Sequence, residues 1–307
     1  MKFFYLLITT FILISTFSLK LSEFKKTDKS YKLSTPTTKE GQRKVYYAQV
    51  PFLKESFVFP ELSAQSIMAS DLPSGKILFD ANSDTPLLPA STTKIVTALV
   101  SMDKYPMEKI LTVGKINIEG QKMHLVEGEK ISVKNLLSGL LIASANDAAE
   151  VLAENYPGGR NAFIEAMNDK VKNLELTSSS FKNPTGLDGD NHLTTARDLV
   201  FISAVAMQRP FFKKTVASKK MVVTSEDGKV VHGLRNLNEL VGEVEGVLGV
   251  KTGWTENARE NLVTYVERGD RKIMIAVLGS EDRFGETRKL IDWIFKNYEW
   301  KRVRKDE

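Results

Sequence analysis

The feature that most constrains this chain is the order in which β-rich and helical segments follow one another. Two short apolar runs, 64–69 and 76–79, flank Leu72-Pro73-Ser74-Gly75, whose Pro and Gly supply turn geometry. Strands, a helical middle, further strands and a last helix predict an α+β fold, in which the first and last strands can join one sheet. The other expected elements are helices at 132–142, 147–156 and 161–174, β-rich runs at 246–250, 261–266 and 272–278, and a closing helix with Leu290, Ile291, Ile294, Phe295 and Tyr298 on one side.

The two ends of the chain are expected to lie outside the folded domain. Met1-Lys2 is followed by a nearly uncharged apolar run, 3–19, so we assign 1–19 to an export signal or an N-terminal anchor. No Ala-x-Ala-like site follows, and cleavage and retention both stay open. Residues 20–58 are rich in Lys, Ser and Thr and are interpreted as a basic, flexible linker. The folded domain is predicted over 59–300, with a charged tail at 301–307.

The net positive charge is concentrated in the predicted linker. Between Lys20 and Lys44 there are eight basic and three acidic residues, and this excess of five equals the net charge of the whole chain, +5. The rest of the chain is neutral, whereas a nucleic-acid-binding domain would carry Lys and Arg on a folded face. The absence of cysteine excludes disulfides, thiolate metal sites and a cysteine nucleophile. The three histidines are not spaced as metal ligands, and we expect neither a metal nor a cofactor.

A candidate nucleophile precedes a helical run near the start of the domain. Ser91 is followed three residues later by Lys94, and on a helix residues three apart share a face. A neutral lysine beside a serine hydroxyl can take its proton and activate it as a nucleophile. The same tetrapeptide pattern occurs at three other serines. Ser91 differs because it follows Pro89-Ala90 in the predicted first turn of a helix, where unpaired N–H groups favour developing negative charge.

Two further short motifs occur once each. Ser144-Ala145-Asn146 separates two predicted helices, and its ordinary interpretation is a helix break capped by Asn146 or Asp147. Such a cap would also let the side chains project into a cleft. Lys251-Thr252-Gly253 ends a β-rich run, where it is either an exposed strand end with a turn glycine or a carboxylate-binding wall. Gly253 would let a substrate backbone approach closely.

In this order, the three motifs resemble the set shared by β-lactamases and penicillin-binding proteins. The flanks resemble the D-alanyl-D-alanine carboxypeptidase family of low-molecular-weight penicillin-binding proteins, from about residue 62 to residue 298. The sequences that carry this likeness are Pro89-Ala90-Ser91-Thr92-Thr93-Lys94, Leu136-Leu137, Ser144-Ala145-Asn146-Asp147-Ala148-Ala149, Asn183-Pro184-Thr185-Gly186-Leu187-Asp188 and Thr195-Ala196-Arg197-Asp198-Leu199. The resemblance implies a β-lactamase/transpeptidase-like fold, an antiparallel sheet flanked by helices with a mostly helical subdomain.

The resemblance also implies catalytic roles. Ser91 would attack the carbonyl of the penultimate D-Ala, with Lys94 as the base and Ser144 as a proton relay toward the departing amine. Asn146 would hydrogen-bond the substrate peptide. A lysine acts as a base near neutral pH only if its pKa lies well below about 10.4. Burial and a second ammonium, from Lys251, would both lower the pKa of Lys94.

Substrate-binding roles follow from the same resemblance. Lys251 and Thr252, beside Gly253, would face the terminal carboxylate, and Arg283 would make a second contact to it. The backbone N–H groups of Ser91 and Trp254 would form the oxyanion hole.

Some residues receive a structural interpretation. His192 is expected to be structural, and the closing helix with Trp293 and Trp300 is expected to pack on the core in preference to anchoring a membrane. The sequence departs from its relatives at Ala258-Arg259-Glu260, where they usually carry a glycine, so the local turn is expected to differ.

The resemblance implies a serine D,D-carboxypeptidase that acts on peptidoglycan stem peptides through an acyl-enzyme and binds β-lactams covalently. An endopeptidase of D-Ala crosslinks is the alternative, because both bonds involve the same acyl group. A class A β-lactamase would carry Asp in place of Ala145 and a Glu that activates water, but Glu165 is expected on a solvated helix face. A catalytically silent wall-binding protein is a further alternative. The chain is expected to be exported, to the periplasmic or extracellular face of the cytoplasmic membrane, which residues 3–19 could contact.

Overall fold

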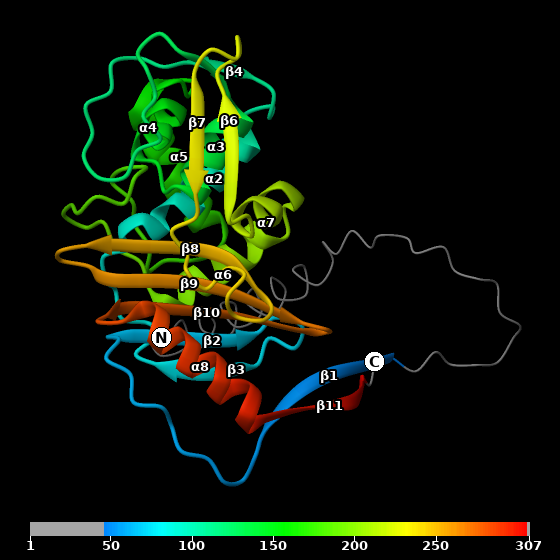
Figure 1. The fold of residues 1–307 in the computed structure, drawn as a ribbon. Helices are drawn as coiled ribbons and strands as arrows, with labels where there is room; N and C mark the ends of the chain where they lie inside the picture. The colour runs from blue at the N-terminus through cyan, green and yellow to red at the C-terminus, as the bar shows by residue number, and fades with distance from the viewer. Residues whose placement is uncertain (1–45, 306–307) are drawn as a thin grey trace, which may run out of the picture. The chain divides into compact units, whose positions relative to one another are not determined.

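A computed structural model describes residues 46–305, which form a five-stranded antiparallel sheet with helices on both faces (Figure 1). The strand order β3-β2-β10-β9-β8 brings strands from the start and the end of the chain into one sheet, as predicted. The strands are β2 (Ser66–Asp71), β3 (Ile77–Ala81), β8 (Val247–Thr255), β9 (Arg259–Arg268) and β10 (Arg271–Ser280). The expected signal or anchor at 1–19, and the expected linker up to residue 45, lie outside the described residues.

The sheet lies between two apolar layers. β2 is buried along its whole length, as expected for a strand covered on both faces. On one face, helix α8 (Arg283–Asn297) packs Leu290, Ile291 and Ile294 against the sheet. On the other face, helix α6 (Ala196–Met207) contacts β2 and β10. The closing helix therefore packs on the core, as its apolar spacing predicted.

A helical subdomain lies beyond the β8 edge of the sheet (Figure 1). Its core is built from buried leucines of α3, among them Leu136, Leu137 and Leu140. Side-chain caps define two of the helix starts, since Ser132 and Thr195 accept hydrogen bonds from backbone N–H groups three residues later. The helices here are α2 (Lys94–Lys104), α3 (Val133–Ile142), α4 (Asn146–Glu154), α5 (Gly159–Asn173) and α7 (Pro210–Val216), with a 3₁₀ turn, η1 (Ala90–Thr93), directly before α2.

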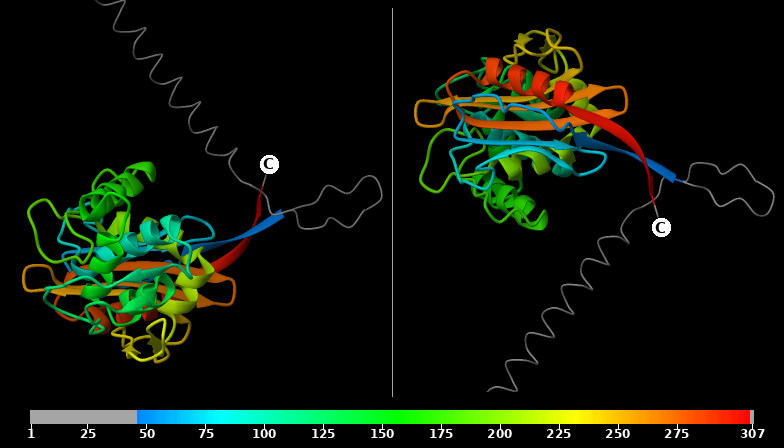
Figure 2. Two further views of the ribbon diagram at one scale, coloured as in Figure 1. Left: turned by 90° about the horizontal axis from the view of Figure 1, so that it is seen from above. Right: turned by 90° about the horizontal axis from the view of Figure 1, so that it is seen from below.

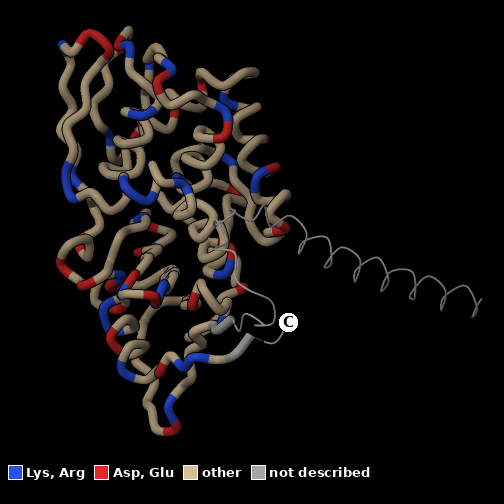
Figure 3. Tube along the Cα trace, turned by 90° about the vertical axis from the view of Figure 1, so that its right-hand side faces the viewer, with Lys and Arg blue, Asp and Glu red and all other residues tan. Residues whose placement is uncertain are grey.

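Two short two-stranded sheets complete the helical subdomain. β4 (Ile110–Thr112) pairs with β5 (Lys130–Ser132), and β6 (Lys220–Thr224) pairs with β7 (Val231–Arg235). Figure 3 shows basic and acidic residues interspersed along the described chain, in keeping with the neutral body expected from the charge count. Within residues 46–305, no helix has the length and apolar character that a membrane span requires.

The folded part extends further at both ends than the sequence suggested. β1 (Tyr46–Leu53) pairs antiparallel with β11 (Tyr298–Lys305), and this two-stranded ribbon projects away from the rest of the described chain (Figure 2). The expected linker at 20–58 therefore includes a strand, and the expected tail at 301–307 is mostly strand. Each of these segments is the other's hydrogen-bonding partner, so neither can be recognised as a strand from its own sequence.

Candidate active site

Ser91 lies in the turn η1, and Lys94 is the first residue of α2. The Lys94 Nζ donates a hydrogen bond of 2.7 Å to the Ser91 Oγ and another of 2.5 Å to the backbone carbonyl of Thr185. The Lys94 side chain is completely buried. The turn is tight, because Ala90 has a left-handed φ of 47° and the Thr92 hydroxyl donates to the Pro89 carbonyl at 2.6 Å. The predicted helical start is thus a 3₁₀ turn that continues into the helix.

Two glycines let neighbouring segments approach this turn closely. A Cβ on Gly186 would lie 1.9 Å from the Ala90 carbonyl oxygen, and Gly186 has a left-handed φ of +89°. A Cβ on Gly253 would lie 3.1 Å from the Ser91 nitrogen. The 183–188 segment and β8 therefore contact the nucleophile turn from two sides, and only glycine fits at residue 186.

Ser144 lies at the break between α3 and α4. It has a left-handed φ of 57°, a costly conformation for a residue other than glycine. The Lys251 Nζ donates 2.9 Å hydrogen bonds to the Ser144 Oγ and to the Thr252 carbonyl. The helix break was predicted correctly, but neither Asn146 nor Asp147 caps α4, because the N-cap is Ala145.

The side chains of Asn146 and Asp147 hold a loop, residues 119–126, against the site. The Asn146 Nδ2 donates to the Glu119 carbonyl at 2.6 Å, and the Asn146 N–H donates to the Gln121 carbonyl at 2.7 Å. The Asp147 carboxylate accepts backbone N–H bonds from Met123 and Leu125 at 3.0 and 3.1 Å. The Asn146 Oδ1 is buried and has no hydrogen-bond partner among the described residues, and Asn146 itself lines the groove described below.

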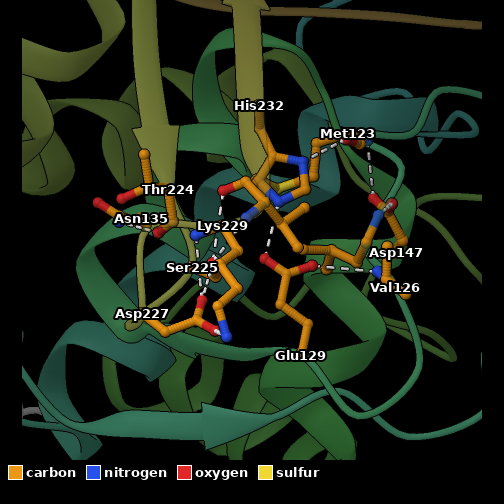
Figure 4. A network of polar contacts seen from close by, with 12 residues as sticks. Met123, Val126, Glu129, Asn135, Asp147, Thr224, Ser225, Asp227, Lys229 and His232 are labelled. Atoms are coloured by element: carbon orange, nitrogen blue, oxygen red, sulfur yellow. Dashed lines mark hydrogen bonds and ion pairs between the residues drawn. The ribbon is translucent and has the colours of Figure 1, made fainter.

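A second buried carboxylate holds the far end of the same loop (Figure 4). Glu129 accepts a bond from the Val126 N–H at 3.0 Å and contacts the His232 Nε2 at 2.7 Å. The other ring nitrogen of His232, on β7, lies 2.9 Å from the Met123 carbonyl. Asp147 and Glu129 together tie residues 119–129 to α4 and to β7.

These elements enclose a groove of about 710 Å³. Lys94 and Lys251 lie beneath its wall, where Lys251 is only 2% exposed. The Arg283 guanidinium reaches the groove from the start of α8 and donates to the Gly253 carbonyl at 2.9 Å. The predicted site residues that line the groove are Ser91, Ser144, Asn146, Thr252, Gly253, Trp254 and Arg283.

Burial determines the electrostatics of the lysines. Burial, and then the Lys251 ammonium, hold the pKa of Lys94 well below its ordinary value. Burial, and then the Arg283 guanidinium, lower the pKa of Lys251 to about 7. Burial also lowers the pKa of Arg283. Lys94 can therefore be neutral beside the Ser91 hydroxyl, as a general base must be.

Sequence reasoning missed several residues that build the site. The Thr185 carbonyl receives the Lys94 amine, and Asn183 holds that loop by accepting from the Thr185 and Gly186 N–H groups at 3.1 and 2.7 Å. The 183–188 segment contributed to the resemblance, but nothing in it indicated a role. A contact through a backbone carbonyl leaves no residue-type signal.

The residues that received a structural interpretation lie outside the groove. His192 is buried behind the nucleophile turn, where its Nε2 lies 2.9 Å from the Thr93 hydroxyl and its Nδ1 accepts from the Lys182 N–H at 2.9 Å. Arg259 begins β9 with a left-handed φ of 57°. A glycine would adopt this conformation without strain, so arginine is an unusual residue at this position. Glu165 lies on the exposed side of α5, outside the groove.

The fold and the groove define a class of protein, the serine acyl-transfer enzymes with a lysine base three residues after the nucleophile. Residues 54–282 match the family model described as D-alanyl-D-alanine carboxypeptidase, Peptidase S11. The chain belongs to this family.

Relatives and solved structures agree with that membership. The chain is 32% identical over 246 residues to D-alanyl-D-alanine carboxypeptidase DacF of Bacillus subtilis, covering 77% of this chain and 63% of the relative. It is 32% identical over 250 residues to DacB2 of Mycobacterium tuberculosis, covering 78% and 85%. It is 31% identical to a D-alanyl-D-alanine endopeptidase of Pseudomonas aeruginosa, covering 76% and 78%. The DD-transpeptidase of Streptomyces K15 superposes with a TM-score of 0.74 at 28% identity, over 78% of this chain and all of that one.

Proposed function

We propose that the protein is a serine D,D-carboxypeptidase that removes the terminal D-Ala from peptidoglycan stem peptides through an acyl-enzyme. The observation that carries the proposal is that two hydroxyls line one groove and each accepts a hydrogen bond from a buried lysine amine beneath the groove wall. The Ser91 Oγ lies 2.7 Å from the Lys94 Nζ, and the Ser144 Oγ lies 2.9 Å from the Lys251 Nζ. Family membership supports the same reaction.

Acylation begins at Ser91. Neutral Lys94 takes the Ser91 proton while the Ser91 Oγ attacks the carbonyl carbon of the penultimate D-Ala. When the tetrahedral intermediate collapses, the C–N bond breaks, and the proton that Lys94 took from Ser91 passes through Ser144 to the departing D-Ala amine, which leaves Lys94 neutral again. Water then cleaves the ester, and its proton restores the Ser91 hydroxyl.

Cationic groups at one end of the groove suit the free carboxylate of the substrate. Lys251, Thr252 and Arg283 would bind it, and Asn146 would accept a hydrogen bond from the substrate peptide. The backbone N–H groups of Ser91 and Trp254 would stabilise the oxyanion, where one such donor contributes about 3 kcal/mol. Support comes from the groove itself, which these side chains line or underlie, and from the close approach of Gly253 to the Ser91 nitrogen.

Penicillin labelling tests the nucleophile and the base. A fluorescent penicillin should attach to Ser91, as peptide mass spectrometry would show, and Ser91→Ala should abolish the adduct. Lys94→Arg should abolish it as well, because guanidinium stays protonated. Normal labelling of a folded Lys94→Arg protein would refute the role of Lys94. A stable adduct with slow cephalosporin turnover would separate this enzyme from a β-lactamase, and an unlabelled wild-type protein would indicate a silent wall-binding protein.

A D,D-endopeptidase is the second candidate, favoured by the likeness to the P. aeruginosa endopeptidase. Both reactions form the same acyl-enzyme, and they differ only in the amine that leaves. Purified protein should be incubated with uncrosslinked pentapeptide muropeptides and with crosslinked dimers, and the products weighed by mass spectrometry. Loss of a single D-Ala from the former supports the carboxypeptidase, whereas monomers released from the latter support the endopeptidase.

The proposed substrate places the enzyme outside the cytoplasm, at the periplasmic or extracellular face of the membrane. The apolar run 3–19 supports export or anchoring. Expression with a tag after residue 307, followed by mass measurement of the membrane and soluble fractions, would show whether residues 1–19 are retained.

A further inference from the structure

Exposed apolar side chains gather at the edge of the sheet that lies farthest from the groove. Six of the eleven exposed large hydrophobic residues in the described chain lie on β1, on β3, on β11 and in the segment that follows β1. We call these six residues and three neighbouring lysines the basal surface. Its members are Phe52, Phe57, Val58, Phe59, Ile77 and Val303 with Lys54, Lys76 and Lys301.

Aromatic contacts join one part of the basal surface to the body. The rings of Phe57 and Phe59 lie 5.0 Å apart, and Phe59 stacks on Trp293 of α8 at 5.4 Å. Phe59 also contacts Phe79 of β3 at 5.9 Å. Despite these contacts Phe59 remains 58% exposed and Val58 remains 85% exposed. The cluster is therefore fixed in place but not covered.

Cations lie over the aromatic face of the ribbon. The Lys76 ammonium is 5.0 Å and the Lys301 ammonium 5.7 Å from the centre of the Phe52 ring. Lys301 and Val303 face the same side of the ribbon, because residues two apart on a strand share a face. Lys301 also lies 3.4 Å from the carboxylate of Glu299, and β1 carries no charged residue. Among the described side chains of the ribbon, Lys301 and Arg302 outnumber the single acid Glu299, so the exposed ribbon is apolar with a net positive charge.

We infer that the basal surface rests on an anionic lipid membrane. Aromatic rings favour the membrane–water interface, and each nearby Lys or Arg is attracted to anionic headgroups. A polyanionic wall polymer would satisfy the lysines but would leave Phe59, Val58 and Val303 exposed to water, so lipid is the partner that fits both features. The chain before β1 has the same character, with an apolar run at 3–19 and a basic stretch from Lys20 to Lys44.

The strand order determines which way the groove faces when the basal surface contacts lipid. β3 and β8 are the two edges of the sheet, four strand spacings or about 19 Å apart. The groove is built on β8 and the basal surface on β3. A protein resting on its basal surface therefore points its groove away from the lipid.

A single fluorescent label tests the inference in the full-length chain, which contains no cysteine to compete. Val303→Cys is labelled with an environment-sensitive dye and mixed with vesicles of equal parts phosphatidylglycerol and phosphatidylcholine. The emission should move to shorter wavelength, and a nitroxide-bearing lipid should quench it. The matched control is Val231→Cys, a valine that is more exposed than Val303 and lies on the β6–β7 hairpin at the opposite end of the described part of the molecule (Figure 1). Both proteins carry residues 1–45, so any binding by that segment is the same in each.

The emission shift and the quenching seen with the dye at residue 303 should be absent with the dye at residue 231. They should also be lost at residue 303 when the protein carries both Lys76→Glu and Lys301→Glu. An unchanged emission at residue 303, or equal responses at the two sites, would overturn the inference. The same wavelength shift with a soluble anionic wall polymer in the absence of lipid would overturn it in favour of the polymer. Activity on a soluble peptide is a separate measurement, and its outcome bears only on the proposed function.

Discussion

Lys94 contacts the Ser91 hydroxyl and Lys251 contacts the Ser144 hydroxyl, and each lysine is useful in only one protonation state. Lys94 must be neutral to accept the Ser91 proton, whereas Lys251 must be charged to hold a carboxylate. Burial lowers the pKa of both, and the charge of Lys251 lowers that of Lys94 further. The productive state therefore requires a pH at which Lys94 has lost its proton while Lys251, with a pKa of about 7, still holds its own.

This pair predicts a particular pH dependence. The second-order rate constant for acylation by penicillin should fall above the Lys251 pKa of about 7. Each pH unit should cost about tenfold as that ammonium loses its proton. In Lys251→Arg the fall should disappear, because guanidinium stays charged through this range. Stopped-flow labelling across pH checks both proteins, with thermal melts at each pH as the control. A fall that persists in Lys251→Arg would assign the titration to another group.

At the scale of an element, the nucleophile turn depends on how closely the 183–188 segment approaches it. Gly186→Ala would place a methyl group 1.9 Å from the Ala90 carbonyl oxygen and would also force a left-handed φ on alanine. A displacement of about 1 Å at a nucleophile can cost about 100-fold in rate, and we expect at least that loss in penicillin acylation.

Gly189→Ala is the matched control in the same loop, since its added methyl group would meet only the His192 Cβ, at 4.0 Å. It should acylate at the wild-type rate. Equal acylation by the two variants, both folded by circular dichroism, would show that the turn tolerates movement of this loop.

The loop 119–126 gives a second prediction at this scale. Asp147→Asn replaces one of the two acceptor oxygens of the carboxylate with an NH₂ group, which would face a backbone N–H. The buried N–H then has no acceptor, which costs about 1–3 kcal/mol of stability. Because this loop borders the groove through Glu119 and Gln121, KM for a D-Ala-D-Ala peptide should rise about tenfold or more, while kcat changes less. Glu127→Gln, an exposed position in the neighbouring turn, should leave both constants unchanged. A wild-type KM in Asp147→Asn would remove the loop from substrate binding.

Sequence patterns predicted the helices and strands that carry their own turn or periodicity signals. They missed the strands β1 and β11, which are defined only by their pairing with each other. The helix break at Ser144 and the strand run that precedes Lys251 carry their own turn and periodicity signals, although β8 continues through Lys251 to Thr255. The strand β1 follows a basic stretch and pairs with residues at the other end of the chain, so no local pattern marks it. Asp147 was expected as a possible cap, and only the folded loop reveals its actual partners.

At the scale of the whole molecule, a buried neutral histidine links stability to acidity. Burial lowers the pKa of His192 to about 4. The ring therefore contributes stability that is fully present above its unfolded pKa of about 6.5 and is lost as pH falls toward its folded value. Over this interval the free energy of unfolding should decrease by about 3 kcal/mol on account of this group.

Urea unfolding at pH 7 and at pH 4 measures this contribution. In His192→Gln the part of the decrease due to the ring should vanish, and stability at pH 7 should drop by about 1–2 kcal/mol because the Thr93 and Lys182 contacts are altered. A pH dependence identical to that of the wild type would mean that other groups control acid stability.

The pairing of β1 with β11 sets the order of events during synthesis. All residues that build the groove emerge from the ribosome or the export channel before Tyr298–Lys305, so the catalytic chemistry can be assembled while β1 still has an unpaired edge. An unpaired strand seeks another strand, from the same chain or from a neighbouring one. Tyr298–Lys305 close that edge by pairing with β1, so a chain without this strand would keep its groove residues yet be prone to associate with its copies.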